Sequence, residues 1–219
     1  APPEACVSPY YARVPAAEAF PAERRGDLAL VVAGVYAGDP DEGRREFERF
    51  RGRDDAFAAS VAEQSYTELQ SMMDDEFPAG RRYYWKSVPV TELTDDAIAV
   101  LQDAATAAPS PLSTVVVWPM HGDVSDAPGS GSPVVGRDAE VVLNVEAAWD
   151  DPETTAANVD WVRDTCERLR DAASIPGTLP NFAGGDAGDA DDVYAEHADR
   201  LRAVRRRYDP DGVLVYERE

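Results

Sequence analysis

Five short stretches of the chain are apolar and rich in β-branched and aromatic residues, which predicts strands. Between them, apolar residues recur at helical spacing behind helix-start signals such as Thr94. The predicted strands cover residues 7–14, 27–38, 81–90, 112–122 and 140–149. The predicted helices lie within residues 39–52, 57–77, 94–108, 150–173 and 191–210. This interleaving favours a sheet covered on one face by helices, in a single domain.

The stretch 140–149 alternates so cleanly that its two faces can be separated from the sequence. Val141, Leu143 and Val145 fall on an apolar face that should meet the helices, whereas Asn144 and Glu146 fall on the other. Those two polar residues are about 7 Å apart along a strand. Their face is either a solvated outer surface, as antiparallel sheets often have, or a surface covered by another domain. In the second case the pKa of Glu146 would rise, and its carboxylate would suit proton abstraction.

The charge of the chain indicates the solvent in which the protein works more than the reaction that it takes part in. The 219 residues include 42 acidic and 21 basic side chains, a net charge of −21, and the acidic ones are spread along the whole chain. A polyanion such as nucleic acid is therefore not an expected partner. No apolar run approaches the roughly 18 residues of a membrane span. We expect a protein adapted to high salt, in which charge repulsion is screened.

Lys86 is the only lysine in the chain and lies in the predicted strand 81–90. Strand alternation groups it with Tyr84 and Val88, and places Ser87 on the opposite face. One reading is that its aliphatic stem covers the aromatic rings while its ammonium reaches water. The other is that an ammonium is needed at this position and that arginine cannot replace it.

The common signatures of enzyme sites are missing from the sequence. It contains no glycine-rich dinucleotide turn, no phosphate-loop lysine and no nucleophile elbow. The two histidines, His121 and His197, are not spaced as paired ligands, so we expect no metal site. Cys6 and Cys166 fit no metal or disulfide pattern, and Cys166 is expected to be a small buried apolar residue.

Several stretches, in order along nearly the whole chain, resemble the C-terminal half of FAD-linked oxidases of the berberine-bridge-enzyme type. This family belongs to the oxidoreductases with an FAD-binding domain of the PCMH type. The most specific matches are "YYWKS" at 83–87 and "RRRYDPDGV" at 205–213. Further matches are "VAGVYAGDPDEG" at 32–43, "GRDAEVVLNVEAAWDDP" at 136–152 and "NFAGGD" at 181–186.

The resemblance implies an α+β substrate-binding domain whose antiparallel sheet lies over the flavin ring, with helices on its outer side. Residues from about 175 to 219 would form the closing C-terminal segment of the family. The family's FAD-binding domain, with its phosphate loops and histidine–flavin linkage, has no counterpart in this sequence. FAD would therefore be bound mainly by a domain outside this chain, and that domain and a small-molecule substrate would be its partners.

The resemblance also assigns roles to individual residues. Glu146 matches the position of a catalytic or substrate-orienting acid or amide, and is our first choice for the base. Asn144, Lys86, Asn181 and His121 are expected to face the substrate or the flavin. The implied reaction is oxidation of an alcohol, sugar or amine by hydride transfer to flavin. The family often uses a tyrosine near Asn181, but this chain has Leu179 and Phe182 there, and we expect it to be inactive alone.

A second reading from a different functional class stays open. The chain would then be a free-standing, non-catalytic remnant that binds a small molecule or a protein partner through the exposed sheet face. An uncovered face also favours self-association, so we expect a homodimer in solution. We expect a cytoplasmic location, with secretion as the alternative.

Overall fold

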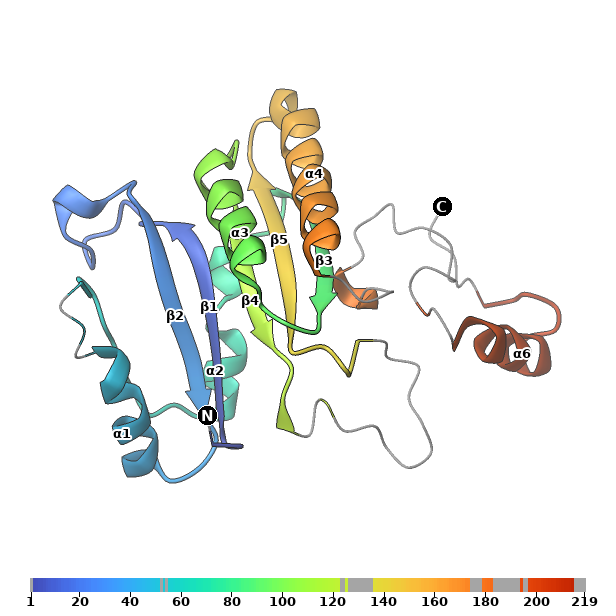
Figure 1. Cartoon of the computed structure of the whole chain (residues 1–219), viewed down its shortest axis with the longest axis horizontal. Helices are drawn as coiled ribbons and strands as arrows, with labels where there is room; N and C mark the ends of the chain where they lie inside the picture. The colour runs from blue at the N-terminus through green and yellow to red at the C-terminus, as the bar shows by residue number, and fades with distance from the viewer. Residues whose placement is uncertain are drawn as a thin grey trace.

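The computed structural model describes residues 2–51, 53, 55–122, 125, 136–173, 179–182, 194 and 197–214. Its centre is a five-stranded antiparallel sheet in the order β2-β1-β4-β5-β3 (Figure 1). The strands are β1 (Ala5–Arg13), β2 (Leu28–Tyr36), β3 (Arg82–Val90), β4 (Thr114–Pro119) and β5 (Val141–Trp149). All five predicted strands are thus confirmed, and so is the α+β fold with an antiparallel sheet.

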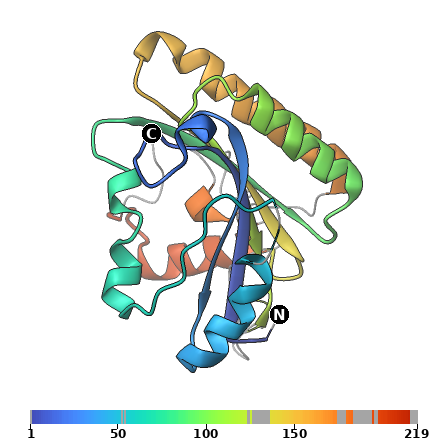
Figure 2. The same cartoon turned by 90° about the vertical axis from the view of Figure 1, so that its left-hand side faces the viewer.

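Three helices flank one face of the sheet: α1 (Pro40–Arg51), α3 (Asp95–Ala107) and α4 (Thr155–Ala173). Figure 2 shows α3 and α4 together on one side of the sheet and α2 (Tyr66–Ser71) on the other. The predicted cap of α3 is present, because the Thr94 hydroxyl accepts a hydrogen bond from the Ala97 backbone N–H at 3.1 Å. In the described part of the chain, no helix is long and apolar enough to cross a membrane.

The helix predicted within 57–77 is confirmed only in part. The structure has α2 and the 3-10 turn η2 (Asp74–Glu76) there, and no helix over residues 57–65. Ser65 begins α2 with a reciprocal capping box to Glu68. The apolar residues that suggested a longer helix, Val61 and Met72, are exposed. Without an apolar face to bury, a short helix gains little from tertiary packing.

The remaining predicted helix, within 191–210, corresponds to α6 (Ala198–Tyr208). Short 3-10 turns lie elsewhere: η1 (Ala22–Arg24) before β2, η4 (Pro152–Thr154) before α4, and η5 (Pro180–Phe182). Asp151 accepts a hydrogen bond from the Glu153 backbone at 2.9 Å and so caps η4 where the sequence changes from strand to helix.

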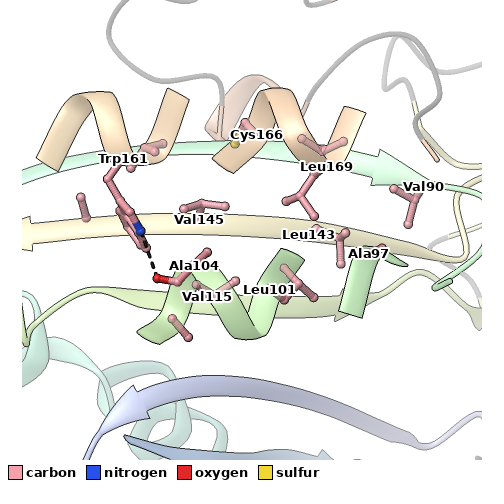
Figure 3. Close-up of a cluster of buried hydrophobic side chains, with 14 of the residues drawn as sticks. Val90, Ala97, Leu101, Ala104, Val115, Leu143, Val145, Trp161, Cys166 and Leu169 are labelled. Atoms are coloured by element: carbon pink, nitrogen blue, oxygen red, sulfur yellow. Dashed lines mark hydrogen bonds between the residues drawn. The ribbon is translucent and has the colours of Figure 1, made fainter. Parts of the chain in front are cut away.

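The hydrophobic core lies between β5 and the helices α3 and α4 (Figure 3). Leu143 and Val145 of β5 and Leu169 of α4 are all inaccessible to solvent. The ring of Trp161 reaches from α4 to α3, where its indole N–H donates to the Ala104 carbonyl at 3.1 Å. The apolar face predicted for the stretch 140–149 is therefore the face that meets the helices.

Candidate functional site

The opposite face of β5 carries Asn144 and Glu146, and it is not an ordinary solvated surface. Asn144 is 0% exposed and Glu146 is half-buried. Their neighbours on the same face of β5, Val142 and Ala148, are also buried. The reading of this face as a solvated outer surface is therefore wrong for Asn144, although no helix of the core cluster lies over it.

Both carboxylate oxygens of Glu146 are held by hydrogen-bond donors. The Asn144 side-chain N–H donates to Oε1 at 2.5 Å, and the Thr114 hydroxyl donates to Oε2 at 2.9 Å. Thr114 is the first residue of β4 and lies directly opposite Glu146 in the β4–β5 register. The carboxylate is thus fixed from its own strand and from the neighbouring one.

Burial raises the pKa of Glu146 above its usual range, and the two hydrogen bonds oppose this rise without cancelling it. Burial disfavours the charged carboxylate, whereas a donor to the carboxylate favours it. A carboxyl group whose pKa is raised toward neutrality is a better proton acceptor near pH 7 than an ordinary surface glutamate. The arrangement is chemically suited to general-base catalysis.

Asn144 brings one further polar atom to this face. Its Oδ1 is buried and has no hydrogen-bond partner among the residues that the structure describes. A buried acceptor without a partner costs about 1–3 kcal/mol, so native proteins rarely keep one without reason. The described part of the chain therefore does not complete the hydrogen bonding of the Asn144–Glu146 pair.

Aromatic side chains border the pair on both neighbouring strands. Trp85 of β3 lies opposite Glu146, and Trp118 of β4 lies opposite Val142. The turn η5 is tied to both: the Trp85 indole N–H donates to the Asn181 carbonyl at 3.1 Å, and the Phe182 ring stacks on Trp118 at 6.4 Å between centroids. The structure therefore brings Asn181 to this face through its backbone, while its side chain is exposed.

Lys86 does not share this face. It pairs with Val145, whose side chain points into the helix-facing core, and Ser87 is the residue of β3 that lies beside Asn144. The Cys166 thiol on α4 donates to the Lys86 carbonyl at 3.7 Å. The structure thus places Lys86 on the sheet face opposite to Glu146 and does not bring the two side chains together.

Cys166 is fully buried, as the sequence predicted. Burial raises the pKa of its thiol to about 11, although the charges of Arg170 and Lys86 act in the opposite direction. The thiol therefore stays protonated at neutral pH, and its role is packing.

His121 lies beyond the end of β4 and is exposed. The five residue steps from Thr114 to the strand end at Pro119 already span roughly 17 Å. The structure therefore does not bring His121 to Glu146. Within the described residues there is also no group of three or more histidine, cysteine or acidic side chains that could hold a metal ion.

The neighbours that β3 and β4 supply to Glu146 are not apparent from the sequence. Thr114, Trp118 and Trp85 become part of the site only through the pairing of β3 and β4 with β5. The alternation in the stretch 112–122 does place Thr114 and Trp118 on one face. The alternation does not indicate which strand pairs with this stretch.

Comparison with known proteins agrees with this architecture. No family model matches the chain. An FAD-linked oxidoreductase of Dictyostelium discoideum is 20% identical over 185 residues, which make up 83% of this chain and 40% of that protein.

Solved structures match the fold of this chain over nearly its whole length, although their sequences are less than 20% identical to it. The berberine-bridge-enzyme-like protein 28 of Arabidopsis thaliana matches 94% of this chain with a TM-score of 0.71 and 17% identity. The 6-hydroxy-D-nicotine oxidase of Arthrobacter nicotinovorans matches 94% with a TM-score of 0.70 and 18% identity. The chain covers 48% and 45% of these two structures. The resemblance found in the sequence is thus confirmed: the chain has the fold of about half of an FAD-linked oxidase of the berberine-bridge-enzyme type.

Proposed function

We propose that the chain is the substrate-binding domain of an FAD-dependent oxidoreductase that oxidises an alcohol, a sugar or an amine. The observation that carries the proposal is Glu146, a half-buried carboxylate held by two donors on the sheet face opposite to α3 and α4. The name of the curated relative, an FAD-linked oxidoreductase, supports FAD as the cofactor. Because the chain spans about half of the structures it matches, we propose that a separate domain binds most of the FAD.

The residues on this face fit the ring end of FAD. Trp85 and Trp118 offer aromatic surface. Asn144 Oδ1, which has no partner within the described residues, offers an acceptor for an N–H or O–H group. A flat ring system that carries an N–H group matches this combination. The sequence has no glycine-rich phosphate turn, so the diphosphate of FAD belongs to the other domain.

Bound FAD supplies the hydride acceptor, and this chain supplies the proton acceptor. Glu146 removes the proton from the hydroxyl or amine of the substrate as the neighbouring C–H bond breaks. Asn144 and Thr114 hold the carboxylate in one orientation during this transfer. Leu179 and Phe182 occupy the positions at which the family often has tyrosine, which leaves the proton transfer to Glu146.

The test is a stopped-flow measurement of flavin reduction in the protein assembled with its FAD-binding domain. That domain is sought in the same reading frame or an adjacent one. Glu146→Gln should slow flavin reduction by roughly 10² or more, the loss typical of removing a positioned base. Glu153→Gln, at an exposed position of η4, is the matched control and should leave the rate unchanged. A Glu146→Gln protein with the wild-type rate would remove Glu146 from the role of base.

The fragment alone gives a second test. The 219-residue chain, mixed with free FAD and dialysed, should retain no yellow flavin absorbance, since the main FAD site is proposed to lie elsewhere. Flavin retained at one equivalent per chain would contradict that division of labour. A chain that binds small molecules but never assembles with an FAD-binding domain would instead support a non-catalytic binding module.

A further inference from the structure

We infer that Thr114 orients the Glu146 carboxylate and keeps it ionised. The side chain at position 114 then sets the lowest pH at which Glu146 can still accept a proton from the substrate. The inference deepens the proposed function and rests on Glu146 being the base. Thr114 itself need not touch the substrate, so we describe it as a positioning residue.

The geometry of the contact comes from strand pairing. Thr114 and Glu146 are direct cross-strand partners, and the hydroxyl of Thr114 donates to Oε2 of Glu146 at 2.9 Å. The other carboxylate oxygen is held by Asn144, two positions before Glu146 on the same strand. Removal of Asn144 would leave the carboxylate bound to the neighbouring strand, whereas removal of Thr114 would leave it bound only to a side chain of its own strand.

Thr114 also provides the larger of the two effects that oppose burial. Burial raises the pKa of Glu146, and the hydrogen bond from Thr114 lowers it more than the hydrogen bond from Asn144 does. An ionised carboxylate can only accept hydrogen bonds, so the hydroxyl must donate to it. A donor that binds the charged form holds the proton off the carboxylate.

Few other charges act on this group within the described part of the chain. The residues that face Glu146 from neighbouring strands are Trp85 and Thr114, and neither carries a charge. The other titratable side chains of the paired strands on this face are Tyr83 of β3 and Cys6 and Tyr10 of β1. Tyr10 is itself influenced by Glu76 of η2. None of these contributes to the shift of Glu146, which leaves its two hydrogen bonds as the counterweight to burial.

The fold alone does not require a hydroxyl at this position. Thr114 shares its face of β4 with Val116 and Trp118, and a β-branched apolar residue would suit the strand equally well. Valine has nearly the shape of threonine without the hydroxyl. Thr114→Val therefore removes the hydrogen bond and little else, and Thr114→Ser restores the hydroxyl.

The test titrates Glu146 in the 219-residue chain by NMR of carbon-13 at the glutamate carboxyl groups. The Glu146 signal is identified by its loss in Glu146→Gln. Thr114→Val should move the titration midpoint of Glu146 to higher pH, and Thr114→Ser should return it to the wild-type midpoint. Circular dichroism checks that each variant is folded. If Thr114→Val does not fold, Thr114→Ala replaces it in the titration.

The assembled protein gives the second readout. On the acidic side of the pH profile, Thr114→Val should slow flavin reduction on the order of tenfold, the loss expected of one hydrogen bond to a charged group. The rate should recover as pH rises, a recovery that a general packing defect would not produce.

An unchanged Glu146 midpoint in Thr114→Val and Thr114→Ala would overturn the inference, whatever the activity of the enzyme. A normal rate of flavin reduction in Glu146→Gln would instead overturn the proposed function. The carbon-13 titration would then still report whether Thr114 controls Glu146. The two failures are thus distinguishable.

Discussion

The two faces of β5 differ as much as two faces of one strand can. Toward α3 and α4, Leu143 and Val145 are apolar, inaccessible and packed against helix side chains. On the other face, Asn144 is just as inaccessible, yet its Oδ1 has no partner in the described part of the chain. Glu146 is half-buried, and its pKa is raised by burial. The first face is what folding needs. The second carries a cost that folding does not explain, and such conflicts mark functional sites.

The largest effect is expected on the helix-facing side. Leu143→Ala should lower the free energy of unfolding by about 2–5 kcal/mol, because it leaves a cavity in a closed core. Urea denaturation of the chain measures the change. The same substitution at the exposed Leu112 should cost less than about 1 kcal/mol. Equal effects at the two leucines would show that this face is not the stabilising one.

Apolar substitutions on the opposite face of β5 should raise the free energy of unfolding instead of lowering it. Replacing the polar pair by apolar residues of similar size, Asn144→Leu with Glu146→Met, should raise the free energy of unfolding by about 1–2 kcal/mol. The reason is that the change removes a buried acceptor that has no partner among the described residues and, with it, a half-buried carboxylate. The same denaturation experiment measures it. A loss of stability of similar size would mean that the pair serves folding rather than function.

Of the residues on the two faces of β5, only Glu146 should make the free energy of unfolding depend on pH. Because burial raises its pKa in the folded state, the folded chain binds more protons than the unfolded chain above the ordinary value of 4.5. The contribution of Glu146 to stability is therefore fully present below pH 4.5 and is lost as pH rises through the raised pKa. Relative to Glu146→Gln, the wild type should lose stability across that window. A difference between the two proteins that does not change with pH would contradict the raised pKa.

The smallest effect is expected for Lys86→Arg. Lys86 lies on the helix-facing side, opposite Val145, so the exchange should leave flavin reduction in the assembled protein within about twofold of the wild type. Stopped-flow measurement with the natural substrate checks it. A large loss of activity would restore the reading of the sequence in which an ammonium is required at this position.

The sequence predicts those features of the fold that are encoded within a single strand or helix. The alternation in 140–149 correctly predicts which residues share each face of β5, since the period of two is a property of one strand. It does not predict that the polar face is closed to solvent at Asn144. The helical prediction within 57–77 holds only for α2 and η2, because helical spacing alone does not supply a surface to pack against over residues 57–65.

Pairing between strands was not readable from the sequence. Lys86 was grouped with Glu146 by family resemblance, although the β3–β5 register places Ser87 beside Asn144 instead. The contact between Thr114 and Glu146 is not readable for the same reason, because it spans 32 positions in the chain. The complete burial of Asn144 depends on the assembled sheet, and no local pattern indicates it.

The central claim is that the flavin lies against the Asn144–Glu146 face, and its position can be mapped directly. The assembled protein is loaded with an FAD analogue that carries a photoreactive azide on the flavin ring, and crosslinked residues are identified by mass spectrometry. We predict crosslinks to the side chains around the pair, such as Trp85, Trp118 and Thr114. Crosslinks confined to α3 and α4, or absent from this chain, would contradict the account.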